Sequence, residues 1–251
     1  MAFAKMPSTW AKQKARLVPT NEGAEVFAGR PVDFLDDPHH VLRYDGLSMF
    51  QWRSHKSHAT AALLILFALA IISNKAQRQN GLRVNEQVAA TYEEIQEVVP
   101  LSRKLIAAGL KLLRLSGAIT THEHGNRSVH TLHGIETNGH WCALPQSHLL
   151  NGFKHLHRLQ LFIDQIKRPA SLRALKLYML LLAFRDNHTN AARMTYEHIA
   201  EYTGLRREET KAAIELLVAT ELCRLAGDDE IPRRKGDGMH NRYVIRGLKA
   251  S

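Results

Sequence analysis

Histidine has the widest chemical range of the residue types in this chain, because a neutral imidazole can bind a metal ion or transfer a proton. The sequence holds 15 histidines, and His122 and His124, like His155 and His157, stand two residues apart. That spacing places two rings on one face of a strand but about 200° apart on a helix. The apolar residues around His155 recur at helical spacing, so we predict that this pair does not share a metal ion. His122 and His124 fall in a predicted strand, where solvated rings or phosphate contacts are expected and a metal site is the alternative.

Motifs of catalysis are missing from the rest of the sequence. It has no glycine-rich loop followed by Lys and Ser or Thr, no paired-carboxylate motif and no nucleophile elbow. Cys142 and Cys223 do not have metal-ligand spacing, and they fit the reduced thiols of a cytoplasmic protein. We therefore predict no enzyme activity, no catalytic residue, no metal, no cofactor and no small-molecule substrate. A nuclease or relaxase that uses the histidines with a divalent metal is the competing hypothesis.

Positive charge is the second chemical feature of the chain. Lys and Arg number 34 against 24 Asp and Glu, which gives a formal charge of +10 and a pI near 9.8. Such an excess attracts polyanions. Arginine also offers a planar fork of donors that fits the O6 and N7 atoms of guanine in the major groove. Double-stranded DNA is therefore the predicted partner, provided that the fold gathers the basic residues on one surface.

An internal duplication indicates how the fold positions them. Residues 91–119 align without a gap on residues 195–223, with 10 of 29 positions identical. Arg103 and Arg207 hold equivalent positions in the two copies. The duplicated segment must therefore place these two arginines in the same local structure.

Each copy of the segment predicts two helices joined by a tight turn. Thr91 and Thr195 suit the N-cap of a short first helix, with acidic residues in its first turn. Pro100 in one copy and Gly204 in the other allow the chain to turn. A second helix then begins at Ser102 or Arg206, with apolar residues at helical spacing on one face and basic residues on the other.

The flanking sequence extends this unit in both directions. An apolar helix is predicted before each copy, at residues 59–72 and 172–184. A two-stranded wing is predicted after each copy, at residues 119–132 and 223–245, and the tip of the second wing is longer by 11 residues. The run at 59–72 has 14 residues, fewer than the ~20 that span a bilayer, so we predict a buried helix and no membrane segment.

The order helix, helix, turn, helix, wing resembles the winged-helix domains of bacterial, plasmid and phage DNA-binding proteins. The resemblance covers residues 171–247 well and 59–134 less closely, because the stretch between the first two helices is longer there. It implies a mainly α protein with small β-wings, of class α+β, with two winged helix-turn-helix domains in tandem. Two unequal copies in one chain resemble plasmid replication initiators, whereas single copies are more typical of transcriptional repressors.

Four segments are expected along the chain. Residues 1–45 contain Lys5, Lys12, Lys14 and Arg16 without sustained periodicity, which predicts a flexible basic arm; a disordered tail is the plain reading and a DNA-tracking arm the alternative. Residues 46–138 and 171–251 are the two predicted winged-helix domains. Residues 139–170 are predicted to form a connecting strand and one helix ending at Pro169, which packs the domains together; a homodimer surface is its alternative role.

The predicted DNA contacts follow from the resemblance and the charges. Recognition-helix residues are Ser102, Arg103, Lys104, Lys111, Arg206, Arg207 and Lys211, with the two equivalent arginines at base edges. Wing residues expected to hold phosphates are Arg127, Arg233, Arg234, Lys235 and Arg242. For Arg103 the alternative is a surface ion pair with a glutamate of the preceding helix.

The resulting hypothesis is a sequence-specific duplex-DNA binder of the cytoplasm, associated with the nucleoid. It would act in transcription regulation or in replication initiation of a bacterial or mobile-element replicon. If only one of the two domains binds DNA, Glu208, Glu209 and Glu215 beside the arginines favour the first domain as the reader, although the basic wing of the second domain argues the other way. The alternative function is a winged-helix assembly factor with only nonspecific DNA affinity.

Overall fold

The structure is a computed structural model that describes residues 3–20, 32–34, 39–80, 87–124, 127–135, 141–151, 155–227, 230–231 and 240–249. Helices predominate in this part of the chain, and its strands form four small antiparallel sheets of two or three strands. The predicted α+β class is confirmed at this level.

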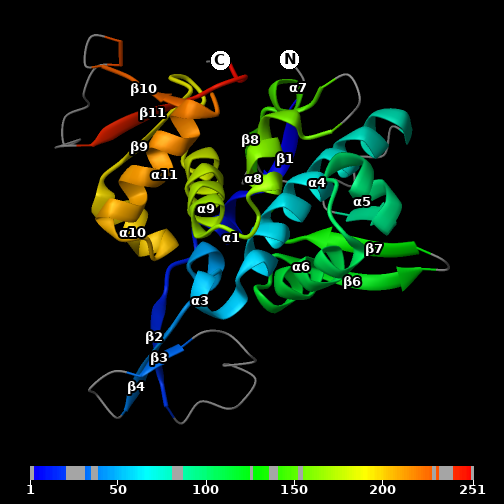
Figure 1. Cartoon of the computed structure of the whole chain (residues 1–251), viewed down its shortest axis with the longest axis horizontal. Helices are drawn as coiled ribbons and strands as arrows, with labels where there is room; N and C mark the ends of the chain where they lie inside the picture. The colour runs from blue at the N-terminus through cyan, green and yellow to red at the C-terminus, as the bar shows by residue number, and fades with distance from the viewer. Residues whose placement is uncertain are drawn as a thin grey trace.

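The first unit contains one long helix, two short helices and a three-stranded sheet (Figure 1). Its elements are α4 (Ser57–Asn80), β5 (Gln87–Ala90), α5 (Tyr92–Val98), α6 (Arg103–Leu115), β6 (Ile119–His124) and β7 (Arg127–Leu132). The strand order is β5-β7-β6, so β7 lies between the other two strands. Strand β6 pairs with β7 from Ile119 opposite Leu132 to His124 opposite Arg127, which makes the predicted hairpin.

The second unit has the same order of elements. They are α9 (Pro169–Ala183), β9 (Ala191–Met194), α10 (Tyr196–Thr203), α11 (Arg207–Ala219), β10 (Cys223–Leu225) and β11 (Asn241–Ile245). Its strand order, β9-β11-β10, matches that of the first unit. The sequence did not predict β5 and β9, because each strand has only four residues, too few for a clear alternating pattern.

Local hydrogen bonds explain where the duplicated helices begin. The Thr91 hydroxyl accepts from the backbone N–H of Glu94 at 3.2 Å, and the Thr195 hydroxyl accepts from that of His198 at 3.2 Å. Both predicted N-caps are therefore confirmed. Gly204 ends α10 in the left-handed region, with φ of 68°, a conformation that other residues adopt only with strain.

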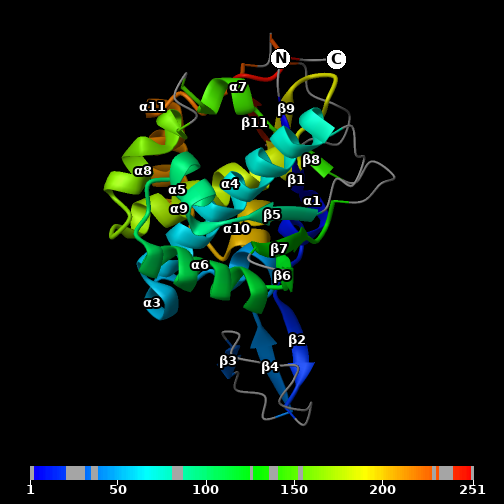
Figure 2. The same ribbon diagram turned by 90° about the vertical axis from the view of Figure 1, so that its right-hand side faces the viewer.

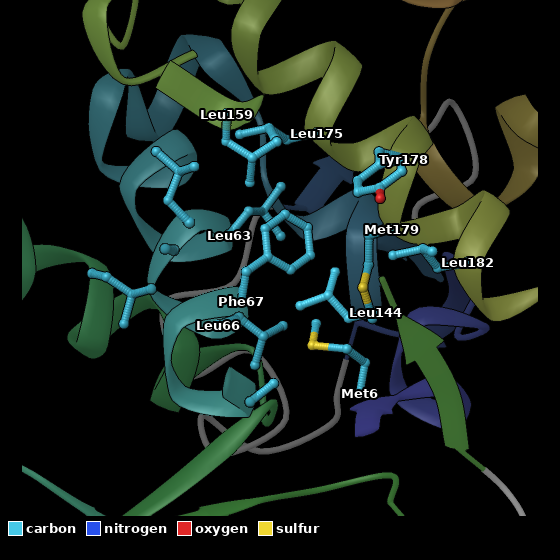
Figure 3. Packing of buried hydrophobic residues seen from close by; sticks show 14 of the residues in the cluster. Met6, Leu63, Leu66, Phe67, Leu144, Leu159, Leu175, Tyr178, Met179 and Leu182 are labelled. Atoms are coloured by element: carbon cyan, nitrogen blue, oxygen red, sulfur yellow. The ribbon is translucent and has the colours of Figure 1, made fainter. Parts of the chain in front are cut away.

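A single apolar core holds the two units together (Figure 3). Every residue from 59 to 71 in α4 is at most 1% exposed, so this helix is covered on all sides. Helix α9 packs directly against α4, and the Phe67 and Tyr178 rings meet edge to face with centroids 6.1 Å apart. Helix α6 covers α4 on one side and α11 covers α9 on the other.

The burial of α4 also decides how its hydrophobicity is interpreted. Residues 57–74 are long and apolar enough to cross a membrane, but 78% of that stretch is buried inside the fold. Because α4 has 24 residues, the predicted length of 14 was too short and does not by itself exclude a span. The burial of α4 inside the fold, and not its length, therefore indicates that it is a core helix.

The N-terminal segment, residues 3–20, begins in this core: residues 4–11 are packed into it. The prediction of a flexible arm at residues 1–45 is therefore wrong for residues 4–11. Strand β1 (Ala4–Pro7) pairs with β8 (Trp141–Leu144), and α1 (Ser8–Ala11) follows it. The buried Trp10 indole donates to the Ser116 carbonyl oxygen at 3.0 Å. A few large apolar residues fix the segment although it lacks periodicity.

A third sheet projects from the body below α3 (Trp52–His55), as Figures 1 and 2 show from two sides. Its strands are β2 (Arg16–Pro19), β3 (Val32–Phe34) and β4 (His40–Arg43), with β4 in the middle. The buried Asp45 carboxylate accepts from Arg43 at 3.0 Å and from Arg16 at 3.1 Å at the base of the sheet. The 3-10 helix η1 (Gly46–Met49) then leads back to the core.

The connecting segment is not one helix. Strand β8 confirms the predicted strand, but α7 (Gln146–Leu149), η2 (His157–Leu159) and α8 (Gln160–Asp164) are short separate turns. Pro169 does not end a helix; it is the first residue of α9, where its missing N–H costs no hydrogen bond. His155 therefore precedes a 3-10 turn instead of lying within a long helix, so the helical argument for His155 and His157 does not apply.

Gly109 of α6 lies directly against α4. A β-carbon there would lie 2.5 Å from Ile65 Cδ1 and 3.1 Å from the Ala62 backbone nitrogen. We expect Gly109→Val to lower the free energy of unfolding by about 1–3 kcal/mol, because the contact is overpacked. Ala107→Val, on the exposed side of the same helix, controls for the β-branched side chain; equal losses in urea denaturation would contradict the prediction.

Lys176 is a buried cation in α9. Its ammonium donates to the Phe50 carbonyl oxygen at 3.0 Å, and burial lowers its pKa from 10.5 to about 7. Because the unfolded chain keeps a proton that the folded chain releases above pH 7, stability should rise with pH in that window. We expect a rise of about 1–2 kcal/mol between pH 7 and about 8.5, absent in Lys176→Met. A pH-independent free energy of unfolding in the unsubstituted protein would contradict it.

Candidate nucleic-acid interface

Helix α6 is the most strongly basic exposed helix surface of the first unit. Ile106, Leu110 and Leu113 point into the core, at most 3% exposed, and Gly109 lets the helix lie close to α4. Ser102 is the N-cap, and its hydroxyl accepts from the Leu105 N–H at 3.4 Å. The side chains on the opposite face therefore point outward in a fixed register.

The outward face of α6 carries only positive charge. Arg103, Lys104, Lys111 and Arg114 are exposed, and the helix contains no acidic residue, so its formal charge is +4. Three of these are predicted site residues. Arg114 was missed, although it lies on the same helix, three residues after Lys111, and its charge is plain in the sequence.

One ion pair connects this face to α5, and a second connects the neighbouring strand β7 to the same helix. Arg103 pairs with Glu93 of α5, and Arg127 of β7 pairs with Glu94 at 3.1 Å. The alternative proposed for Arg103, an ion pair with a glutamate of the preceding helix, is thus present in the free protein. The Arg103 side chain is still 69% exposed, and such exposed pairs contribute roughly 0–1 kcal/mol, so a phosphate or base can replace the glutamate.

Helix α11 of the second unit, together with its N-cap Arg206, has a different charge balance. Arg206, Arg207 and Lys211 are exposed, but Glu208, Glu209 and Glu215 share the segment, so three positive and three negative charges cancel. The Arg206 backbone N–H donates to the Glu209 carboxylate at 3.0 Å. The Arg207 guanidinium lies over the Tyr196 ring, 5.3 Å from its centroid.

The second wing differs from the prediction at Arg242. This arginine is only 7% exposed, and its guanidinium donates to the Ile231 carbonyl oxygen. Its burial contradicts a phosphate-binding role, because β11 is the middle strand and turns this side chain inward. Arg233, Arg234 and Lys235 lie outside the described residues.

The N-terminal lysines contact the second unit. Lys14 pairs with Glu201 of α10 at 2.7 Å, with both side chains about half exposed, and its ammonium lies over the Tyr202 ring. Lys12 lies over the Phe184 ring, with its ammonium 4.8 Å from the centroid. These two basic residues therefore attach the N-terminal segment to α10 and to the end of α9, a contact that composition alone could not show.

The histidines of the first wing do not form a metal centre in the part of the chain that the structure describes. No group of three or more His, Cys, Asp or Glu side chains is arranged there to hold an ion. His122 and His124 are exposed, whereas His130 is buried and its ring shares a hydrogen bond of 2.9 Å with the Thr121 hydroxyl.

No protein-family model, curated protein or solved structure matches this chain. The function must therefore be argued from the residues and the geometry described above.

His130 tests the electrostatics of the first wing. Burial, and then the nearby Arg114, lower the pKa of its imidazole from 6.5 to about 4. We expect the ring resonances of His130 to stay constant in NMR spectra from pH 8 down to about pH 5, because the imidazole stays neutral over this range. A neutral ring adds no positive charge to the first wing. His130→Gln assigns the resonance, and a titration midpoint near 6.5 would contradict the assigned burial.

Proposed function

We propose that the two units are winged helix-turn-helix domains and that the protein binds double-stranded DNA in a sequence-specific manner. The shared element order and strand order of the two units support a structural duplication. The observation that carries the binding proposal is the exposed face of α6, with four basic side chains and no acidic one. Binding through such a face follows from charge neutralisation of phosphates together with donors at base edges.

The first unit is the principal reader in this proposal. The first turn of α6 enters the major groove, where Arg103 exchanges Glu93 for the edge of a guanine. Lys104, Lys111 and Arg114 contact phosphates or neighbouring bases, and Arg127 of the wing does the same after leaving Glu94. Both exchanges replace exposed ion pairs with contacts to a more highly charged partner.

The second unit contributes less. Its recognition helix is formally neutral when the N-cap Arg206 is counted, and Arg207 would have to leave the Tyr196 ring to reach a base. Because the two recognition helices differ in charge and sequence, a site contacted by both has unequal halves. Action on transcription or on replication of a bacterial or mobile-element replicon both fit such a binder, and the position of its DNA site beside a promoter or an array of origin repeats distinguishes them.

A second candidate function is an assembly factor that binds DNA only nonspecifically. It is favoured by exposed apolar side chains in the second unit, Val218 at 41% and Leu225 at 54% exposure. A protein partner covering that unit would account for them. This candidate expects no enriched DNA sequence.

Selection of bound sequences from a random duplex library at about 150 mM salt tests the proposal. A defined motif is expected, and Arg103→Ala should weaken binding to it by about 1–3 kcal/mol and relax one position. Arg207→Ala should have a smaller effect. No enrichment, with binding that disappears as salt rises, would overturn sequence-specific binding and favour the assembly factor.

Glu93→Gln is the matched control for Arg103. If Arg103→Ala acted only by breaking the surface ion pair, Glu93→Gln would weaken binding equally. If Arg103 contacts DNA, Glu93→Gln should leave affinity unchanged or raise it, because the arginine is released. Lys111→Ala should reduce the slope of log affinity against log salt by about 1, whereas Lys167→Ala, in the connecting segment, should leave it unchanged.

A further inference from the structure

A cavity of about 460 Å³ lies between the N-terminal segment and the second unit. One side is formed by the projecting sheet and α3, and the other by the first half of α9 and the turn that leads into α11. Its polar and aromatic lining includes Tyr44, Trp52, Arg53, Arg173, Lys176 and Arg206. The volume lies in the range of ligand sites, roughly 300–1,000 Å³.

Lys176 is the unusual member of this lining. Its side chain is buried, with the residue 4% exposed, and its only hydrogen bond among the described residues goes to the neutral Phe50 carbonyl oxygen. An ammonium has three donors, so two remain for the cavity. A buried charge is costly unless an opposite charge lies close to it. Burial lowers the pKa of Lys176 to about 7, and the nearby Glu209 carboxylate, which is bonded to Arg173, opposes this shift without cancelling it.

The other charged groups of the cavity leave it positive. Arg173 is paired with Glu209, and Arg53 is paired with Asp33 at 2.7 Å. The Arg206 guanidinium has no carboxylate partner among the described residues. With Lys176 protonated, the four basic side chains and the two carboxylates give the lining a net charge of +4 − 2 = +2.

We propose that this cavity binds a small phosphorylated ligand. The phosphate would receive hydrogen bonds from Lys176, Arg206 and Arg173, and supply the missing negative charge. Trp52 is half-buried and gives the cavity an aromatic surface against which a flat ring can pack. A nucleoside monophosphate has this combination of groups.

The position of the cavity implies a coupling to the second unit. The cavity includes residues 203–206, which end α10 and precede α11, so a bound phosphate contacts the start of the second recognition helix. If that helix contacts DNA, as the proposed function holds, ligand and DNA must alter each other's affinity by the same factor. Ligand binding itself does not depend on DNA binding and is measured without DNA.

Isothermal titration calorimetry of the full chain with AMP and with inorganic phosphate tests the site. Saturable binding is expected for both, with AMP the tighter because of the aromatic surface of Trp52. Lys176→Met and Arg206→Gln should each weaken AMP binding at least tenfold. Lys167→Met, exposed and outside the cavity, should bind AMP like the unsubstituted protein.

The outcomes distinguish failure of the ligand site from misfolding of a variant and from failure of the DNA-binding proposal. Absence of saturable binding by the folded protein, or equal binding by the unsubstituted protein and Arg206→Gln, overturns the site. Phosphate binding as tightly as AMP overturns the role of Trp52. Circular dichroism checks that the variants are folded. If Lys176→Met does not fold, AMP binding by Arg206→Gln, a substitution at an exposed position, decides. Failure of the DNA selection would leave AMP binding intact.

Discussion

The packing of α4 against α9 is the contact on which the rest of the structure depends. Both helices are apolar on almost every side, so neither is stable in water unless other elements surround it. Each covers part of the other, and α6 and α11 cover further sides. Strands β1 and β8 complete the enclosure near Met6 and Leu144. The two units therefore share a common core and are not connected by a linker alone.

This shared core gives the N-terminal segment its role. It contributes Met6 and Trp10 to the interior, and its Lys12 and Lys14 then attach to α10 and the aromatic rings beside it. The same chain passes Phe50, whose carbonyl oxygen receives the buried Lys176. The cavity beside α11 exists because this segment covers the turn of the second unit.

The two units have the same order of elements but differ in the charge of their exposed helices. In the first, α6 presents four basic side chains, of which Arg103 is held by an exposed ion pair to α5. In the second, α11 carries three acidic and two basic residues after its N-cap Arg206, and its Glu209 binds Arg173 within the protein. The duplication thus preserves the frame of helices and strands, while the outward residues have diverged.

Residue types and their spacing were enough to predict much of the local structure of the duplicated segment. The duplicated segment, its threonine caps, the turn at Gly204 and the outward face of α6 follow from residue types and helical spacing, which act over a few residues. Only the tertiary structure decided the fate of the N-terminal segment, the broken connection before Pro169, the burial of Arg242 and the ion pair of Arg103. Each of these depends on contacts between different elements of the fold, whose free energies no local pattern records.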